Sequence, residues 1–241
     1  MKKLILIFFA IVLFSCNNGT NKSTDGGSNT PASGDVITAE KQQLLTPDSV
    51  ITLLKSGNRR FSTFRPLIMN DSLRIRLTDT SQHPMAAVLS CLDSRVPVET
   101  VFNMGIGDLF VARVAGNIGN EDIWGSLEYA TSVIHAKVIM VLGHENCGAI
   151  KSAIDIPDTA RLGNITTLLA KIRPAVRATQ TTGERNSRNK KFVHDVMLKN
   201  VEFTIKKMRE DSPIISKLEK DNKIKIIGGI YDVANGKITF L

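Results

Sequence analysis

Three features that would assign this sequence to a broad class are missing from it. It has no run of lysine and arginine with interleaved aromatic residues, so we expect no nucleic-acid partner. It has no visible internal repeat. Its unbroken apolar stretch, residues 4–14, is eleven residues long, whereas a helix needs about 20 to cross a bilayer of about 30 Å. The 241 residues are 42% hydrophobic, enough for one sizeable core.

The first sixteen residues resemble the export signal of a bacterial lipoprotein. Lys2 and Lys3 precede the apolar stretch, and Ser15 and Cys16 follow it in the pattern of a lipobox. We expect a signal peptide over residues 1–15 and lipidation of Cys16. A cleaved signal with a chance cysteine is the alternative. The resemblance implies a protein anchored by lipid in the bacterial cell envelope, on the periplasmic side or the outer membrane.

Polar residues dominate the segment that follows. Residues 17–35 are rich in glycine, serine and asparagine, and such a segment cannot bury a core. We therefore expect a flexible tether over residues 16–43 and a folded catalytic domain over residues 44–241. Without the signal, 29 basic side chains face 23 acidic ones, a net charge of +6 that is typical of a soluble basic protein.

Short apolar runs alternate with helical patterns through the rest of the chain. Thr46 and Pro47 have the residue types of a helix start, and Asn235-Gly236 is a strong hairpin signal. We expect strands over residues 85–90, 109–114, 138–142, 224–231 and 237–240, and helices over 124–130, 162–176 and 191–208. This order predicts an α/β fold with a central, mainly parallel β-sheet flanked by helices.

Two cysteines and a histidine follow predicted strands. Cys91 comes directly after the first strand, and His144 and Cys147 come after the third. Because sites in open α/β sheets form beyond the carboxyl ends of strands, these side chains are expected to converge at one rim. Three sulfur and nitrogen ligands with no natural fourth suit a catalytic zinc site rather than a closed structural one. Two alternatives remain: buried small hydrophobic cysteines, or a disulfide between Cys91 and Cys147.

Two short motifs resemble the signature of the β-class carbonic anhydrases. They are Cys91-x-Asp93-x-Arg95 and His144-x-x-Cys147-Gly148, and the resemblance extends over residues 45–241. It implies one Zn²⁺ per subunit, held by the Cys/His/Cys set. It also implies a lyase (carbonate dehydratase) that reversibly hydrates carbon dioxide to bicarbonate and a proton through a zinc-bound hydroxide.

The resemblance implies further roles for individual residues. Asp93 matches the carboxylate that accepts a hydrogen bond from the zinc-bound water or closes the site as a fourth ligand, and Arg95 matches its ion-pair partner. Three positions match the substrate pocket, although each would be an ordinary loop or core residue in most proteins: Gln82, Phe110 and Tyr129. The main-chain N–H of Gly148, just after the last ligand, is also expected to face the pocket, because the missing Cβ permits close approach.

Assembly and competing functions complete the expectations. The family forms dimers with crossed N-terminal helices, so we expect a homodimer or a higher homo-oligomer with an N-terminal helical arm. Hydrolysis of carbon disulfide or carbonyl sulfide is one competing function, and non-catalytic zinc binding by a surface lipoprotein is another. His83 and His194 are candidates for proton transfer, but the simpler interpretation is that both are surface histidines.

Overall fold

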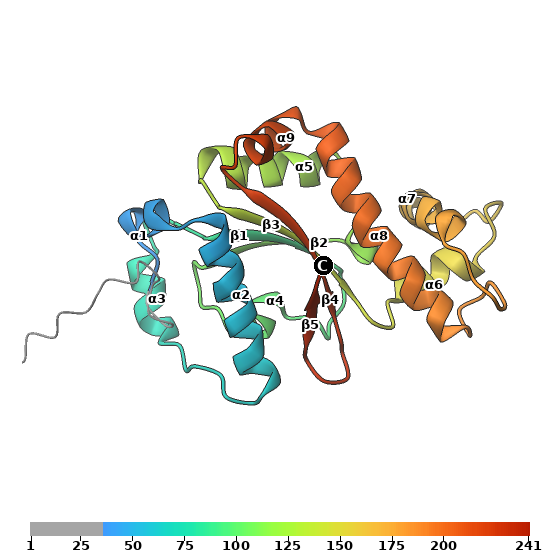
Figure 1. Ribbon diagram of the computed structural model, residues 1–241, viewed down its shortest axis with the longest axis horizontal. Helices are drawn as coiled ribbons and strands as arrows, with labels where there is room; N and C mark the ends of the chain where they lie inside the picture. Colours follow the sequence, from blue (N-terminus) through green and yellow to red (C-terminus); the bar gives the residue numbers. More distant parts are fainter. Residues whose placement is uncertain (1–35) are drawn as a thin grey trace, which may run out of the picture.

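The computed structural model describes residues 36–241, and the expected signal peptide, Cys16 and most of the tether lie outside the described residues. Five strands form one sheet in the order β2-β1-β3-β4-β5 (Figure 1). The first four strands run parallel and the fifth runs antiparallel. Their bounds are Ala86–Ser90, Leu109–Arg113, Val138–His144, Lys225–Tyr231 and Ile238–Phe240 for β1 to β5. The α/β fold with a mainly parallel central sheet is confirmed.

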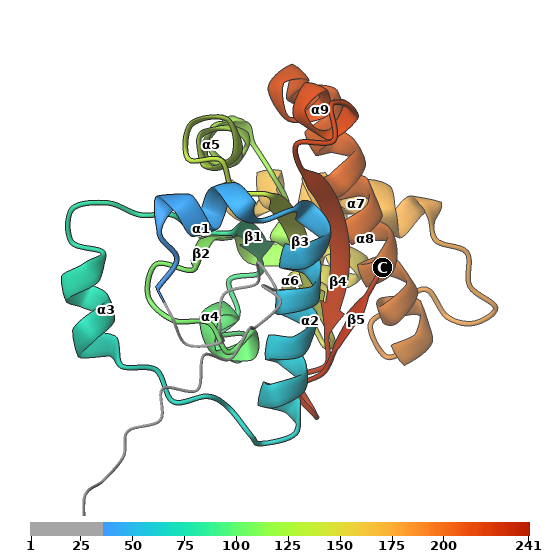
Figure 2. The same ribbon diagram turned by 60° about the vertical axis from the view of Figure 1, so that its left-hand side comes forward.

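Helices cover both faces of the sheet, as Figures 1 and 2 show. One face carries α1 (Ala39–Leu44), α2 (Pro47–Ser62) and α4 (Val98–Val101), and α3 (Asp71–Leu77) lies beside them. The other face carries α5 (Glu121–Glu128), α6 (Gly148–Asp155), α7 (Asn164–Ala178), α8 (Lys190–Asp211) and α9 (Pro213–Lys220). Each face has its own buried apolar cluster.

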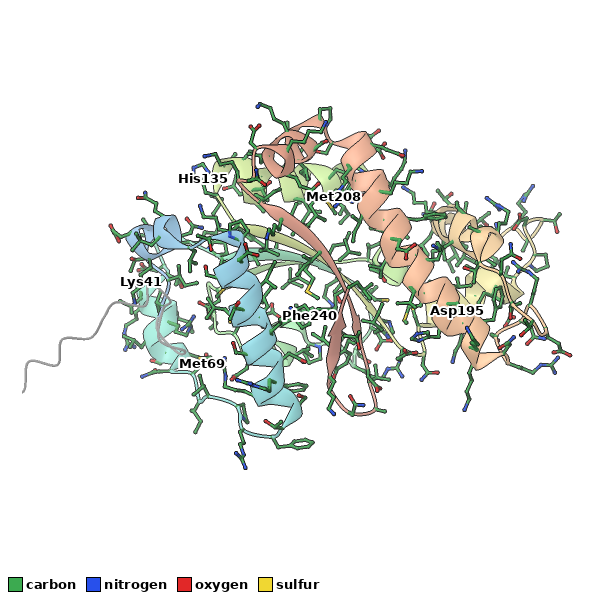
Figure 3. All side chains as sticks on the ribbon, viewed as in Figure 1. Lys41, Met69, His135, Asp195, Met208 and Phe240 are labelled. Carbon is green, nitrogen blue, oxygen red and sulfur yellow. The ribbon has the colours of Figure 1, made fainter. Side chains whose placement is uncertain are left out.

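Alternation along the strands divides the core between the two faces. On β1, Val88 belongs to the cluster under α2, whereas Leu89 belongs to the cluster under α8. A strand buried on both faces reads as a continuous apolar run, which is why the sequence pattern located β1 and β3. Helix α8, by contrast, is buried on one side only: Met208 is fully buried, whereas Asp195 pairs with the exposed Lys191. Met208 and Asp195 are both labelled in Figure 3.

The helix start at Thr46 is confirmed. Its hydroxyl accepts a hydrogen bond from the Ser49 N–H, the Ser49 hydroxyl accepts one from the Thr46 N–H, and Pro47 opens α2. The hairpin differs in detail from our expectation, because β4 and β5 are joined by residues 232–237 rather than by Asn235-Gly236 alone. Gly236 has a φ of 76°, the left-handed conformation that glycine adopts without strain.

Ordered structure begins before residue 44, where we expected the folded domain to begin. Helix α1 precedes that point, and Ile37 and Gln42 are both buried. The Gln42 side-chain amide donates to the carbonyl oxygens of Pro84 at 2.8 Å and Ile134 at 2.9 Å, which fixes α1 to the body of the fold. Among residues 36–241, no helix is both long and apolar enough to span a membrane.

Candidate metal centre

The three predicted ligands meet at one rim of the sheet. Cys91 directly follows β1, His144 is the last residue of β3, and Cys147 is the N-cap of α6. Strands β1 and β3 are parallel neighbours, so their carboxyl ends lie side by side. The ligand atoms lie within 4.8 Å of one another, and all three side chains are buried.

The His144 imidazole is held in one orientation. Its Nδ1 lies 2.9 Å from the Glu145 carbonyl oxygen, and since a carbonyl only accepts, Nδ1 carries the proton. The neutral ring then has a free lone pair on Nε2. This atom is buried and has no hydrogen-bond partner among the described residues. A metal ligand needs a buried nitrogen of this kind, with a lone pair free to bind the ion. The hydrogen bond from Nδ1 to a backbone carbonyl is typical of metal-binding histidines.

The two cysteine sulfurs form a coupled pair 3.8 Å apart, and the structure has both as free thiols. The hydrogen bond with Cys91 lowers the pKa of Cys147 to about 7, with support from the Ala149 and Ile150 N–H groups at the start of α6. The same hydrogen bond, together with burial, raises the pKa of Cys91. Cys147 therefore ionises first, and the Gly116 N–H, 3.2 Å from the Cys91 sulfur, supports the second thiolate when it forms.

Asp93 and Arg95 form a bidentate ion pair at the edge of this cluster. The Arg95 Nε and Nη2 atoms donate to the two carboxylate oxygens, each at 2.9 Å. The guanidinium holds the pKa of Asp93 well below its usual range, and the Arg95 backbone N–H adds to the effect. Asp93 is therefore ionised, and its Oδ2 lies 3.6 Å from His144 Nε2, beside the atom that would face a metal.

Arg113 supports the same loop, although the sequence analysis assigned it no role. Its guanidinium donates to the backbone carbonyls of Cys91, at 3.3 Å, and of Asp93. Arg113 is the last residue of β2, so it stands at the same rim as the ligands. Its place at the end of a predicted strand is the feature of the sequence that would have indicated a role for Arg113 at this site.

The predicted substrate residues divide into two groups. Gly148 begins α6 directly after the last ligand, and apart from its chain neighbours and the backbone of α6 no atom lies within 4 Å of the place its Cβ would occupy. Gln82 is exposed and precedes β1, so the whole of that five-residue strand, about 17 Å long, separates it from Cys91. The structure therefore brings Gly148, but not Gln82, to the ligands of the same chain.

Phe110 and Tyr129 lie together, away from the ligands. Their ring centroids are 6.5 Å apart in an edge-to-face arrangement. They line a hollow of about 720 Å³ beside the edge strand β2, and none of the three ligands is among the described residues that line it. Within one chain, these two residues do not form a pocket with the metal cluster.

Comparisons with known proteins agree on one family. The profile described as carbonic anhydrase matches residues 86–238. The chain is 31% identical to the carbonic anhydrase of Mycolicibacterium smegmatis over 188 residues, which are 77% of this chain and 88% of that protein. It is 32% identical to carbonic anhydrase 2 of Mycobacterium tuberculosis H37Rv over 187 residues, covering 76% and 87%.

Solved structures show the same likeness in three dimensions. The β-carbonic anhydrase of Coccomyxa superposes with a TM-score of 0.64 at 25% identity, covering 71% of this chain and 78% of that one. A tetrameric β-carbonic anhydrase of Sordaria macrospora superposes with a TM-score of 0.58 at 24% identity, covering 70% and 90%. The second likeness bears on the fold alone.

Proposed function

Because the chain belongs to the β-class carbonic anhydrases, which are zinc enzymes acting on carbon dioxide and bicarbonate, we propose that Cys91, His144 and Cys147 hold its catalytic zinc. The observation that carries this proposal is the cluster of three buried donor atoms within 4.8 Å at the carboxyl ends of two strands. Two thiols and an imidazole are a donor set that suits Zn²⁺. When bound, the zinc ion supplies the Lewis acidity that makes water a nucleophile near neutral pH.

The Asp93 carboxylate orients the attacking water. Since Arg95 keeps it ionised, it accepts a hydrogen bond but has no proton to donate. A water proton directed at Asp93 leaves an oxygen lone pair to attack the carbon of carbon dioxide. The products are bicarbonate and a proton that passes to solvent. The same ion pair argues against simple zinc storage, which does not need an oriented carboxylate.

A neighbouring subunit completes the substrate pocket in this proposal. Tyr129 is 49% exposed, and it lies with Phe110 beside β2, whose outer edge is unpaired within the described chain. A second copy docked along β2 would cover these rings and bring them, with Gln82, toward the ligands of the partner. A homodimer or a higher homo-oligomer is therefore proposed, and the Sordaria structure is described as tetrameric.

Assembly is tested with a charge placed in this hollow. Tyr129→Lys should weaken association and lower activity together, measured by sedimentation velocity and by carbon dioxide hydration over a range of protein concentrations. Ser126→Lys is the control, because Ser126 lines the same hollow but is not one of the proposed substrate-binding residues. This variant should lose activity only to the extent that it loses association. Full activity in a monomeric Tyr129→Lys variant would contradict the proposed cross-subunit pocket.

Anchoring in the cell envelope is proposed from the sequence alone. The candidate lipidation residue, Cys16, follows an apolar stretch and a serine in the lipobox pattern. Labelled palmitate should enter the full chain expressed in a bacterium and should not enter the Cys16→Ser variant. Equal labelling of both chains would contradict lipidation at this residue.

The function itself is tested by stopped-flow hydration of carbon dioxide with residues 36–241, with the zinc content measured on the same sample. One zinc per chain and rapid hydration are expected, and Cys147→Ser should lose both. Assays with carbon disulfide and carbonyl sulfide on the same sample identify the competing substrates. A chain that binds zinc stoichiometrically and hydrates no carbon dioxide would refute the proposed role of the cluster.

A further inference from the structure

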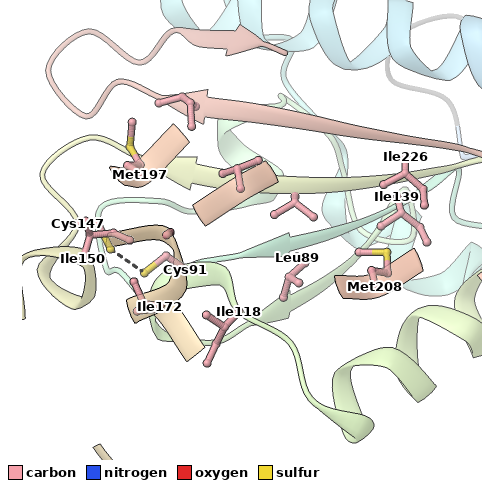
Figure 4. Close-up of a cluster of buried hydrophobic side chains, with 14 of the residues drawn as sticks. Leu89, Cys91, Ile118, Ile139, Cys147, Ile150, Ile172, Met197, Met208 and Ile226 are labelled. Carbon is pink, nitrogen blue, oxygen red and sulfur yellow. Dashed lines mark hydrogen bonds between the residues drawn. The ribbon is translucent and has the colours of Figure 1, made fainter. Parts of the chain in front are cut away.

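Helix α8 packs directly against the end of the strand that carries His144. Gly143 is the preceding residue, and a Cβ there would lie 2.9 Å from a Val201 methyl carbon and 3.6 Å from Met197 Cγ. Both contacts come from α8, so the glycine allows the helix to approach the strand closely. Figure 4 shows Met197 and the two ligand cysteines in this part of the core. The helix is therefore a rigid neighbour of the metal rim.

One side chain of α8 reaches the loop beyond β3. His194 Nδ1 lies 2.6 Å from the Glu145 carboxylate oxygen Oε1. The backbone of Glu145 is held as well, because its N–H donates to the Tyr231 carbonyl at 2.9 Å. The Glu145 carbonyl in turn accepts the hydrogen bond that sets the ring of His144. An unbroken chain of contacts thus runs from α8 to the Nε2 atom of a ligand.

A second side chain of α8 reaches another ligand. The buried Asn200 donates through Nδ2 to the Gly116 carbonyl oxygen at 2.8 Å. The N–H of the same glycine donates to the Cys91 sulfur at 3.2 Å. Gly116 has a φ of 74°, so the peptide groups on its two sides take directions that other residues reach only with strain. Asn200 holds that conformation in place.

We propose that α8 positions two of the three metal ligands, an inference that rests on the zinc assignment above. Its His194 acts on the ligand His144 through one intermediate residue. Its Asn200 acts on the ligand Cys91 in the same way. Neither side chain touches a ligand, so both are positioning residues. The alternative for His194 is an ordinary surface ion pair, which has little effect on anything beyond its own neighbourhood.

His194 gives the sharper test, because it is partly exposed and its variants are expected to fold. Loss of a direct hydrogen-bond partner of a ligand typically weakens metal binding about 10- to 100-fold. His194 acts through Glu145, so His194→Ala should weaken Zn²⁺ binding at the lower end of that range, about 10-fold, in competition with a chromophoric chelator. His194→Asn keeps an N–H donor where Nδ1 stands and should recover most of the affinity. Lys191→Ala is the matched control, since it removes an ion pair of the same 2.6 Å length one turn away on α8.

Two further measurements separate positioning from general weakening of the fold. The Co²⁺-loaded His194→Ala protein should show shifted d–d bands, whereas Lys191→Ala should match the parent spectrum. In a Glu145→Ala background, His194→Ala should weaken metal binding by less than threefold, because its route to the ligand is already cut. The Asn200→Ala variant should instead change the thiolate-to-cobalt charge-transfer band, with its thermal unfolding followed as a check on folding.

Unchanged Zn²⁺ affinity and an unchanged Co²⁺ spectrum in His194→Ala would overturn the proposal for this arm. Equal loss of affinity in His194→Ala and Lys191→Ala would also overturn it, because the effect would then be general. These readouts involve no carbon dioxide. A chain with tight, His194-dependent zinc binding and no hydration activity would therefore refute the proposed function while leaving the positioning role intact.

Discussion

The coupled cysteine pair predicts how zinc binding depends on pH. Both thiols must lose their protons to become ligands. With the pKa of Cys147 at about 7 and that of Cys91 raised above its ordinary value, the two protons leave in well-separated steps. The two thiols should then release about 1.9 protons at pH 6, about 1.5 at pH 7 and about 1.1 at pH 8 when zinc binds, since the fraction of Cys147 still protonated falls over this range. The proton that the zinc-bound water loses near neutral pH adds to this count.

The affinity follows from the same numbers. Between pH 6 and pH 8 the proton on Cys91 accounts for about a 100-fold rise in apparent Zn²⁺ affinity, and the proton on Cys147 for about a further tenfold, so the total is about 1,000-fold. Two independent thiols with ordinary pKa values would instead give about 10,000-fold over the same range. The sign is that of a deprotonation: affinity rises with pH, and the contribution of Cys147 to the slope falls away above pH 7.

Calorimetry in buffers of different ionisation enthalpy counts the protons released, and chelator competition gives the affinities. After a chelator has removed the zinc, the ultraviolet absorbance of the thiolate gives an independent titration of Cys147. In the Cys91→Ala variant the hydrogen bond that is the main cause of the lowered pKa is gone, so Cys147 should titrate closer to 9. A Cys147 titration that Cys91→Ala leaves unchanged would refute the reasoning.

Three further outcomes are expected. Arg95→Met removes the first cause of the lowered Asp93 pKa, so the acid limb of the pH–activity profile should move to higher pH in stopped-flow assays, and an unmoved limb would contradict the role of the pair. Gly143→Ala should lower the free energy of unfolding, measured in urea, by about 1–3 kcal/mol, because the added methyl group overpacks against α8. Gly148→Ala has open space at its Cβ and should change this free energy by less than about 1 kcal/mol. Equal effects of the two substitutions would argue against the close approach of α8. When a chelator removes the zinc in the presence of an oxidised dithiol, Cys91 and Cys147 should form a disulfide, because their sulfurs lie 3.8 Å apart. Counting the free thiols with and without zinc should show that zinc prevents this oxidation. Two free thiols in the zinc-free protein after prolonged oxidation would contradict the prediction.

Local patterns were sufficient to predict the sheet and the ligand set. Strands β1 and β3 are buried on both faces, so each appears as an unbroken apolar run. Cys91, His144 and Cys147 stand directly after those runs, and the carboxyl ends of parallel strands meet at one rim. The pairing of Asp93 with Arg95 was expected from the family resemblance, and the structure shows it as a bidentate contact within one loop.

Other parts of the site depend on contacts between distant segments. His194 lies 49 residues from Glu145, and Asn200 lies 84 from Gly116, so no local pattern marks either pair. The anchoring of α1 by Gln42 is of the same kind, because its amide reaches carbonyls 42 and 92 residues away. Each of these contacts joins a side chain to a group whose position is decided only when helices and sheet pack together.

The sequence by itself indicated which side chains can bind a metal and at which edge of the sheet they gather, because the strands and their ends follow from short-range apolar patterns and the carboxyl ends of parallel strands meet at one edge. Only the tertiary structure decided which nitrogen of His144 is free, which thiol ionises first, and that Phe110 and Tyr129 stand apart from the ligands of their own chain. The physical reason is that tautomers, thiol pKa values and pocket membership depend on neighbours a few ångströms away in space. For the thiols, those neighbours come from different elements, Cys91 after β1 and Cys147 at the start of α6, and they meet only through the packing of the domain.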